Sequence, residues 1–127
     1  GHLVGLSASA CQRRIKQLKE LGIIKREVAI LDRDKLPGFT TVIIDVILEK
    51  GGEAALDSFI EQLNKESRVQ QFYYVAGEAD FVVITVVRNM TEFDELTRRL
   101  LMSNSNVKKF SSKVAIQSNK LGLELPL

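Results

Sequence analysis

The stretch VAGEADFVVITVVRNMTEFDEL, residues 75–96, determines the fold that we expect for this chain. The turn-forming residues Gly77 and Asp80 precede residues 81–87, an apolar run that is interrupted only by Thr85. Because apolar residues occupy both alternating positions, this run indicates a strand that needs cover on both of its faces. Thr91 then fits a helix N-cap, with Asp94 in the position of a capping box.

Elements on both sides of this stretch complete a regular order. We expect strand 40–48, a turn at Gly51-Gly52, helix 54–64, strand 69–76, strand 81–87, a helix after Thr91 and strand 107–117. β-Branched residues favour the strands, and apolar residues spaced three or four apart favour the helices. The order βαββαβ predicts an α+β, ferredoxin-like fold, in which both helices lie on one face of a four-stranded antiparallel sheet.

The opposite face of that sheet then has no covering layer. Since strand 81–87 is apolar on both sides, it would leave a large apolar area exposed there, and such areas usually mark interfaces. We therefore expect the chain to dimerise through this face. In the alternative, the N-terminal strand or the C-terminal tail, which contains Leu121, Leu123 and Leu125, covers the face within one chain.

The N-terminal part, VGLSASACQRRIKQLKELGIIKREVAIL over residues 4–31, has the pattern of the second half of a helix-turn-helix. Gly5 with Leu6 permits a tight turn, Ser7 can cap a helix over residues 8–21, and Gly22 fits a left-handed C-cap. A basic strand is expected at residues 25–31. The predicted domains are therefore 1–31 for partial DNA binding, a linker at 32–39 marked by Pro37 and Gly38, and a second domain at 40–127.

The expected helix is amphipathic and basic. Its apolar stripe contains Cys11, Ile15, Leu18 and Leu21. The candidate DNA contacts lie largely elsewhere and are Ser7, Ser9, Gln12, Arg13 and Lys16. Such side chains suit a major groove, since Arg and Gln supply forked donors for base edges while Lys and Ser meet phosphates. The alternative interpretation is an ordinary solvated helix.

Charge is distributed unevenly along the chain. Residues 1–35 hold eight Lys or Arg and four Asp or Glu, which makes them net +4. Residues 36–127 hold ten basic and twelve acidic residues, which makes them net −2. A basic arm on a mildly acidic body fits a nucleic-acid contact at one end of the chain and another task at the other.

Composition excludes several classes of protein. With 127 residues and 45% hydrophobic residues, the chain has the composition of a globular protein. It contains no apolar run that approaches a membrane span and no visible signal peptide. Cys11 is the only cysteine and is expected to be a small core residue, so a reduced, cytoplasmic protein is the default. His2 beside Gly1 has the pattern of a tag remnant.

Two segments together resemble the Lrp/AsnC (leucine-responsive/asparagine, or feast/famine) transcriptional regulators. GLSASACQRRIKQLKELGIIKREVAILDRDKLP, residues 5–37, is similar to the recognition helix, strand and linker of that family. VAGEADFVVITVVRNMTEFDEL is similar to the central signature of its amino-acid-binding RAM domain. The resemblance extends from Val4 to about Gln117.

The resemblance implies binding of double-stranded DNA by the full-length protein, with no cofactor and a small amino acid as a possible effector. It also implies dimers that assemble into higher oligomers such as octamers, with the effector between dimers. The effector residues that it implies are Gly77, Glu78, Ala79 and Asp80 in one turn, and Ser112 in the last strand. A carboxylate such as Asp80 can hold an ammonium group, although Gly77 and Asp80 are also standard residues of a tight hairpin.

The first half of the helix-turn-helix is absent from this sequence. We expect residues 1–22 to be mobile or to be held by a partner chain, because their apolar stripe lacks its supporting helices. The leading hypothesis is a DNA-binding transcriptional regulator, and the main alternative is a stand-alone effector-binding module that co-assembles with full-length paralogues. An enzyme is not expected, since the sequence has no internal histidine, no metal-ligand set and no Gly-rich phosphate loop.

Overall fold

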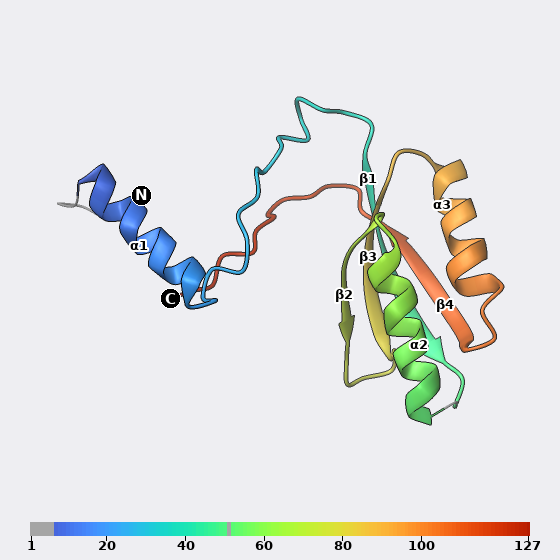
Figure 1. Ribbon diagram of the computed structural model, residues 1–127. Coiled ribbons are helices and arrows are strands. Elements are labelled where there is room, and N and C mark those ends of the chain that lie inside the picture. The colour runs from blue at the N-terminus through green and yellow to red at the C-terminus, as the bar shows by residue number, and fades with distance from the viewer. Residues whose placement is uncertain (1–6, 51) are drawn as a thin grey trace. The chain divides into compact units, whose positions relative to one another are not determined.

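A computed structural model describes residues 7–50 and 52–127 of the chain. The expected turn at Gly5-Leu6, the Gly1-His2 start and Gly51 lie outside the described residues. The chain divides into two compact units, Gly1–Asp32 and Arg33–Leu127. The first unit contains helix α1 (Ala8–Glu20), and the second contains all of the strands that the structure describes (Figure 1).

The second unit has the ferredoxin-like architecture that the sequence predicts. Its elements are β1 (Thr40–Leu48), α2 (Gly52–Lys65), β2 (Val69–Tyr74), β3 (Phe81–Val87), α3 (Met90–Thr97), a π-helical turn η1 (Arg98–Met102) and β4 (Val107–Val114). The strands form one antiparallel four-stranded sheet in the order β2-β3-β1-β4. Figure 1 shows α2 and α3 on the same face of this sheet.

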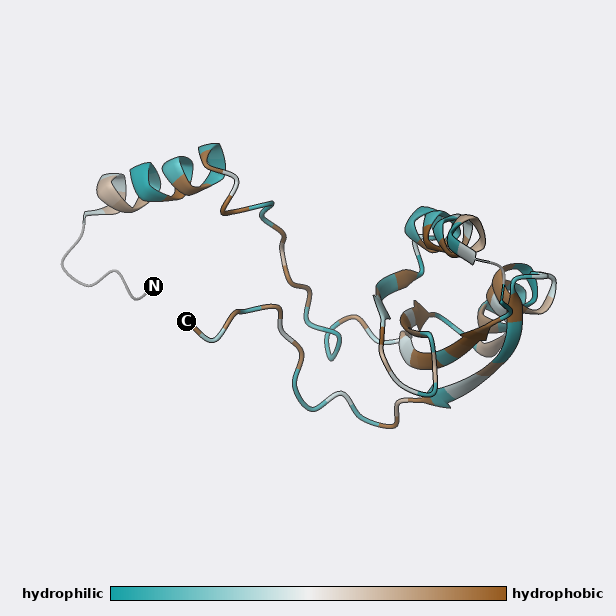
Figure 2. Ribbon diagram, turned by 90° about the horizontal axis from the view of Figure 1, so that it is seen from below, coloured by the Kyte–Doolittle hydropathy of each residue, from teal (hydrophilic) through white to brown (hydrophobic). Residues whose placement is uncertain are grey.

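The core lies between the sheet and the two helices. Alternate residues of β1 and β3 point into it, as Val42 and Phe81 do, and both of these side chains are fully buried. Phe59 of α2 packs edge-on against Phe81, with 5.2 Å between the ring centroids. Thr85 is the one polar residue in the apolar run of β3. Its buried hydroxyl has a hydrogen-bond partner, because it donates a 2.9 Å hydrogen bond to the carbonyl of Val42. Figure 2 shows the hydrophobic residues concentrated on the central strands.

The other face of the sheet has no helix of this chain over it. Ile43 and Ile47 of β1, together with Val82, Ile84 and Val86 of β3, alternate with the core residues and are partly buried. We call these five residues the open face. Leucines of the C-terminal tail do not cover it within one chain, since Leu121, Leu123 and Leu125 are 63–74% exposed. Dimerisation through this face stays a prediction.

The predicted cap of the third helix was wrong by two residues. Asn89, not Thr91, is the N-cap, and its side chain accepts a 2.8 Å hydrogen bond from the backbone N–H of Glu92. Asp94 is therefore not the capping-box residue. Glu92 reaches back instead and accepts from the N–H of Arg88. Asn is at least as good an N-cap as Thr, so the earlier helix start satisfies the exposed N–H groups equally well.

The predicted strand at residues 25–31 does not form. These residues belong to no helix or strand, and Val28 and Ile30 are 58% and 85% exposed. A strand needs a neighbour for its backbone N–H and C=O groups, and no other described segment supplies one. The last strand is also shorter than predicted, since it ends at Val114 rather than at Gln117, although the N–H of Ala115 still donates to the carbonyl of Thr41 at 2.9 Å.

Candidate functional site

Helix α1 has well-defined ends that its sequence explains. The Ser7 hydroxyl accepts a hydrogen bond from the N–H of Ala10 at 3.2 Å, which confirms the predicted cap. At the other end Gly22 has φ +76°, a left-handed conformation that favours glycine. The N–H of Gly22 donates to Lys19 and that of Ile23 to Leu18, the paired bonds of a Schellman motif.

The candidate DNA contacts on α1 form one polar face. Ser9, Gln12, Arg13 and Lys16 are spaced three and four residues apart, and all four are exposed. The apolar stripe of Cys11, Ile15 and Leu18 lies on the opposite side of the helix, as its spacing predicts. None of the thirteen residues of α1 is buried, and the described residues of the unit Gly1–Asp32 cover this stripe only in part.

The turn between β2 and β3 is tied to the end of β1 by Asp80. One carboxylate oxygen of Asp80, Oδ2, accepts a hydrogen bond of 2.7 Å from the backbone N–H of Leu48. The backbone N–H of Asp80 donates to the carbonyl of Val46, and its carbonyl accepts from the N–H of Val75. Asp80 therefore joins three strands at one end of the sheet, which is the structural role that a hairpin residue would have.

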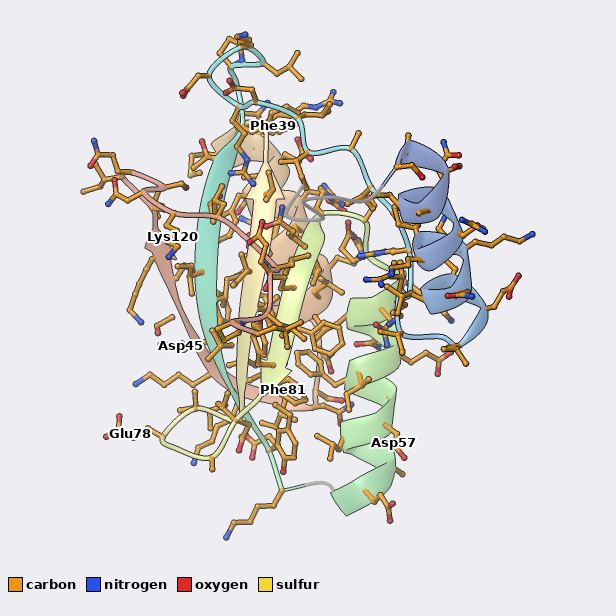
Figure 3. The ribbon with its side chains drawn as sticks, turned by 90° about the vertical axis from the view of Figure 1, so that its left-hand side faces the viewer. Phe39, Asp45, Asp57, Glu78, Phe81 and Lys120 are labelled. Carbon is orange, nitrogen blue, oxygen red and sulfur yellow. The ribbon has the colours of Figure 1, made fainter. Side chains whose placement is uncertain are left out.

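Gly77, Glu78 and Ala79 form the tip of that turn. Gly77 and Glu78 are exposed, Ala79 is partly buried, and Figure 3 shows Glu78 pointing away from the sheet. The structure thus brings together four of the five predicted effector residues, and it does so within one loop. Such a loop offers backbone N–H groups and a carboxylate, which together match the two charged groups of an amino acid.

Ser112 does not join this group within one chain. It lies on β4 opposite Ile44, on the far side of β1 from the turn, whereas Asp80 contacts β1 at Val46 and Leu48. Ile44 and Leu48 are four positions apart, which corresponds to about 13 Å along the strand. Ser112 and the turn can contribute to one ligand site only if they come from different copies of the chain.

A cluster of ion pairs, which the sequence did not predict, joins the start of β2 to α3. Arg68 contacts Glu66 at 2.9 Å, Glu95 at 2.8 Å and Glu92 at 3.8 Å. Arg99 contacts Glu66 and also Glu95. The Glu66 side chain is only 8% exposed. Hydrogen bonds from Arg68 lower the pKa of Glu66 to about 2, and the bond from Arg99 acts in the same direction.

The sequence carried a weak signal for this cluster. Glu92, Glu95 and Arg99 are spaced as neighbours on one helix face, but nothing in the sequence shows that Arg68 lies beside them. The bond between Asp80 and Leu48 is equally hidden, because its acceptor and donor are 32 residues apart. Contacts of this kind depend on the assembled sheet and helices rather than on local pattern.

Other classes of site find no support among the described residues. No group of three or more His, Cys, Asp or Glu side chains is placed to hold a metal ion in the part of the chain that the structure describes. The described helices are also too short or too polar to cross a lipid bilayer.

Comparison with known proteins gives matches along nearly the whole chain. Residues 41–124 match the family model of the Lrp/AsnC ligand-binding domain, and residues 2–25 match that of a winged helix-turn-helix DNA-binding domain. An uncharacterised HTH-type transcriptional regulator of Sinorhizobium fredii is 36% identical over 98% of this chain and 73% of its own length.

Two solved structures are similar in fold as well as in sequence. An AsnC-family transcriptional regulator from Agrobacterium tumefaciens is 31% identical, with a TM-score of 0.84 over 97% of this chain and 80% of that chain. A transcriptional regulator from Neisseria meningitidis, solved as a complex with L-methionine, is 27% identical. Its TM-score is also 0.84, over 97% of this chain and 79% of that chain.

Proposed function

The chain belongs to the Lrp/AsnC family of transcriptional regulators, and we propose that its DNA binding responds to a small amino acid held at the turn formed by residues 77–80. The family and its members are DNA-binding regulators rather than enzymes. The observation that carries the proposal is the turn itself, where backbone N–H groups and the Asp80 carboxylate lie in one exposed loop at the end of the sheet. A regulator must reach DNA, so we place the protein in the cytoplasm.

The DNA contact is assigned to the polar face of α1. Gln12 and Arg13 present forked donors that suit base edges, while Lys16, Ser9 and Ser7 suit phosphates. Residues 1–35 carry net charge +4, which favours approach to a polyanion. If α1 were only an ordinary solvated helix, substitutions on its polar face would not change the affinity for DNA.

Salt dependence tests the DNA assignment. In titrations of the full-length regulator with its own promoter DNA, the affinity is expected to fall steeply as salt increases. Lys16→Ala should reduce the slope of log affinity against log salt by about one, the effect of one lost phosphate contact. Arg14→Ala is the matched control, because Arg14 lies off the polar face. Equal slopes for wild type and Lys16→Ala would contradict the assignment.

The effector is expected to bind with its carboxylate on the backbone N–H groups of the turn and its ammonium beside Asp80. Only Oδ2 of Asp80 is engaged by Leu48, and among the described residues Oδ1 accepts no hydrogen bond. The complex of the Neisseria relative with L-methionine supports an amino acid as the class of ligand. Ser112 would complete the site from a neighbouring copy, which matches a cleft between dimers.

Calorimetry against the twenty amino acids tests the effector. A ligand that binds only the folded oligomer should raise its melting temperature in proportion to the logarithm of ligand concentration. Asp80→Asn should weaken binding while keeping an acceptor for the N–H of Leu48, and Glu78→Gln serves as the control on the same loop. If Asp80→Asn bound the same amino acid as tightly as wild type, the Asp80 carboxylate would have only a structural role in the turn and no role in ligand binding.

Assembly is proposed to begin with a dimer through the open face. An apolar, helix-free sheet face of this kind is the surface that a second copy would cover most favourably. Dimers would then associate into a larger ring such as an octamer. Light scattering at several protein concentrations measures both steps, and a single monomeric mass at all concentrations would contradict them.

A further inference from the structure

An ion pair lies on the same side of the sheet as the open face. The Lys113 ammonium of β4 contacts the Asp45 carboxylate of β1 at 2.7 Å. Asp45 alternates with the buried residues Ile44 and Val46, so it points away from the core. Figure 3 shows the sheet from this side, with Asp45 labelled on β1.

Asp45 occupies an unusual place for a carboxylate. It lies on a central strand between Ile43 and Ile47, and its neighbour on β3 is Val82. Asp is disfavoured in strands, and a charge in the middle of an apolar surface is costly once that surface is covered. The Asp45 side chain is still 32% exposed and that of Lys113 is 67% exposed, so in one chain the pair remains partly in water.

A second copy over this face would remove that water from both charges. In a two-fold dimer each patch meets its own image, so a contact between residue i and residue j occurs twice. This side of β1 and β4 carries Asp45, Lys113 and, farther along β4 opposite Ile47, Lys109. Asp45 and Lys113 are complementary to their own images when Asp45 of one copy lies toward Lys113 of the other. If Asp45 of one copy instead lay opposite Asp45 of the other, the two carboxylates would repel each other strongly, because the covered interface has a low dielectric constant.

We propose that Asp45 and Lys113 determine which chains this protein pairs with, by forming a four-charge cluster with Lys113 and Asp45 of a second copy. The inference rests on the proposed dimer through the open face. The apolar residues of that face supply affinity, while the two charges reject a partner whose face carries a different arrangement of charge.

Charge exchange tests the inference. The double variant Asp45→Lys/Lys113→Asp restores the ion pair within each chain and is expected to form homodimers as readily as wild type. Asp45→Lys alone is expected to weaken the homodimer at least tenfold. When wild-type and exchanged chains are mixed and re-equilibrated, native mass spectrometry should find fewer than a tenth of the statistical share of mixed dimers. Mixed dimers at the statistical share would overturn the inference.

Two controls separate the possible failures. Asp94→Arg/Arg98→Asp exchanges an ion pair of 2.8 Å on α3, away from the open face, and its chains should mix with wild type at the statistical share. Ile84→Glu places a charge on the open face itself and should convert the dimer into monomer, with circular dichroism confirming that the fold persists. If folded Ile84→Glu stayed dimeric, the proposed dimer face would be wrong and the inference would fail with it. If Ile84→Glu were monomeric but mixing were statistical, only the charge inference would fail.

Discussion

At the scale of single residues, the Asp80 carboxylate has one observed role in the fold and one proposed role in ligand binding. Its Oδ2 atom accepts from the N–H of Leu48 and so holds the end of β1 against the turn, while the proposed ligand would use the other oxygen. A hydrogen bond to a charged acceptor contributes about 1.5–3 kcal/mol to stability. Substitution of Asp80 therefore affects folding as well as ligand binding, and the two effects have to be measured separately.

We expect Asp80→Ala to lower the free energy of unfolding by about 2 kcal/mol, because the N–H of Leu48 loses its acceptor. Asp80→Asn should lose about half as much, since the amide oxygen can still accept. Urea unfolding in the absence of amino acids measures both. Glu78→Gln on the exposed tip of the turn should change stability by less than about 0.5 kcal/mol. Wild-type stability in Asp80→Ala would show that the bond to Leu48 contributes nothing.

Glu66 links stability to pH. Arg68 and Arg99 hold its pKa at about 2, below the 4.5 of an unperturbed carboxyl. The folded state therefore binds this proton more weakly than the unfolded state. The stabilisation is complete above pH 4.5 and is lost as pH falls from 4.5 to about 2. The difference between the two pKa values corresponds to at most about 3 kcal/mol.

Urea unfolding of wild type and Glu66→Gln between pH 7 and pH 2.5 checks this linkage. The variant should be less stable than wild type at pH 7, and the gap should narrow toward pH 2.5. Glu61→Gln is the matched control, because Glu61 forms only an exposed ion pair with Lys65. A constant difference between Glu66→Gln and wild type at every pH would mean that ionisation of Glu66 does not contribute.

At the scale of elements, the sequence predicted those helices, strands and caps whose formation depends on residues close together in the chain. Residues 81–87 have an apolar periodicity that only a buried central strand satisfies, and they form β3. Gly22 was identifiable because its place after the helix requires φ above zero. Residues 25–31 have strand-like composition but no pairing partner among the described residues, and so form no strand. Partners distant in sequence, such as Leu48 for Asp80, could not be predicted because they depend on the assembled sheet.

The start of α3 shows how two local signals compete. Asn89 and Thr91 are both acceptable N-caps, and the structure uses Asn89. The Glu92 side chain also accepts a hydrogen bond from the backbone N–H of Arg88. Asn89→Ala should lower the free energy of unfolding by about 1 kcal/mol, because the N–H of Glu92 loses its acceptor. Thr91→Ala, which removes no cap, should cost less than about 0.5 kcal/mol. Thermal or urea unfolding of both variants measures the difference, and a larger loss for Thr91→Ala would reverse the assignment.

At the scale of the whole molecule, the division into Gly1–Asp32 and Arg33–Leu127 separates the proposed DNA contact from the core. The boundary lies at the start of the segment that the sequence predicted as the linker. Arg33 already belongs to the second unit, because its guanidinium donates a 2.7 Å hydrogen bond to the Thr41 hydroxyl. Phe39 also lies under the guanidinium of Arg88, at 6.0 Å from the ring centroid. Residues 25–31 of the connection are exposed and lie outside any helix or strand.

Limited trypsin digestion tests that division. Cleavage after Lys25 and Arg26, which are exposed and lie outside any helix or strand, should precede cleavage after Arg33. Lys109 and Lys113 should be protected, since β4 is hydrogen-bonded to β1 along its length. Mass spectrometry identifies the order of the cuts.

The large fragment that begins at Glu27 should keep a cooperative thermal transition, because the core residues all come from the second unit. It should also lose affinity for DNA, because α1 is removed while the turn at residues 77–80 is retained. An amino acid that stabilises the intact chain should therefore stabilise the fragment too. Loss of the thermal transition on cleavage would mean that the N-terminal unit contributes to the core. Retention of DNA affinity would move the DNA contact away from α1.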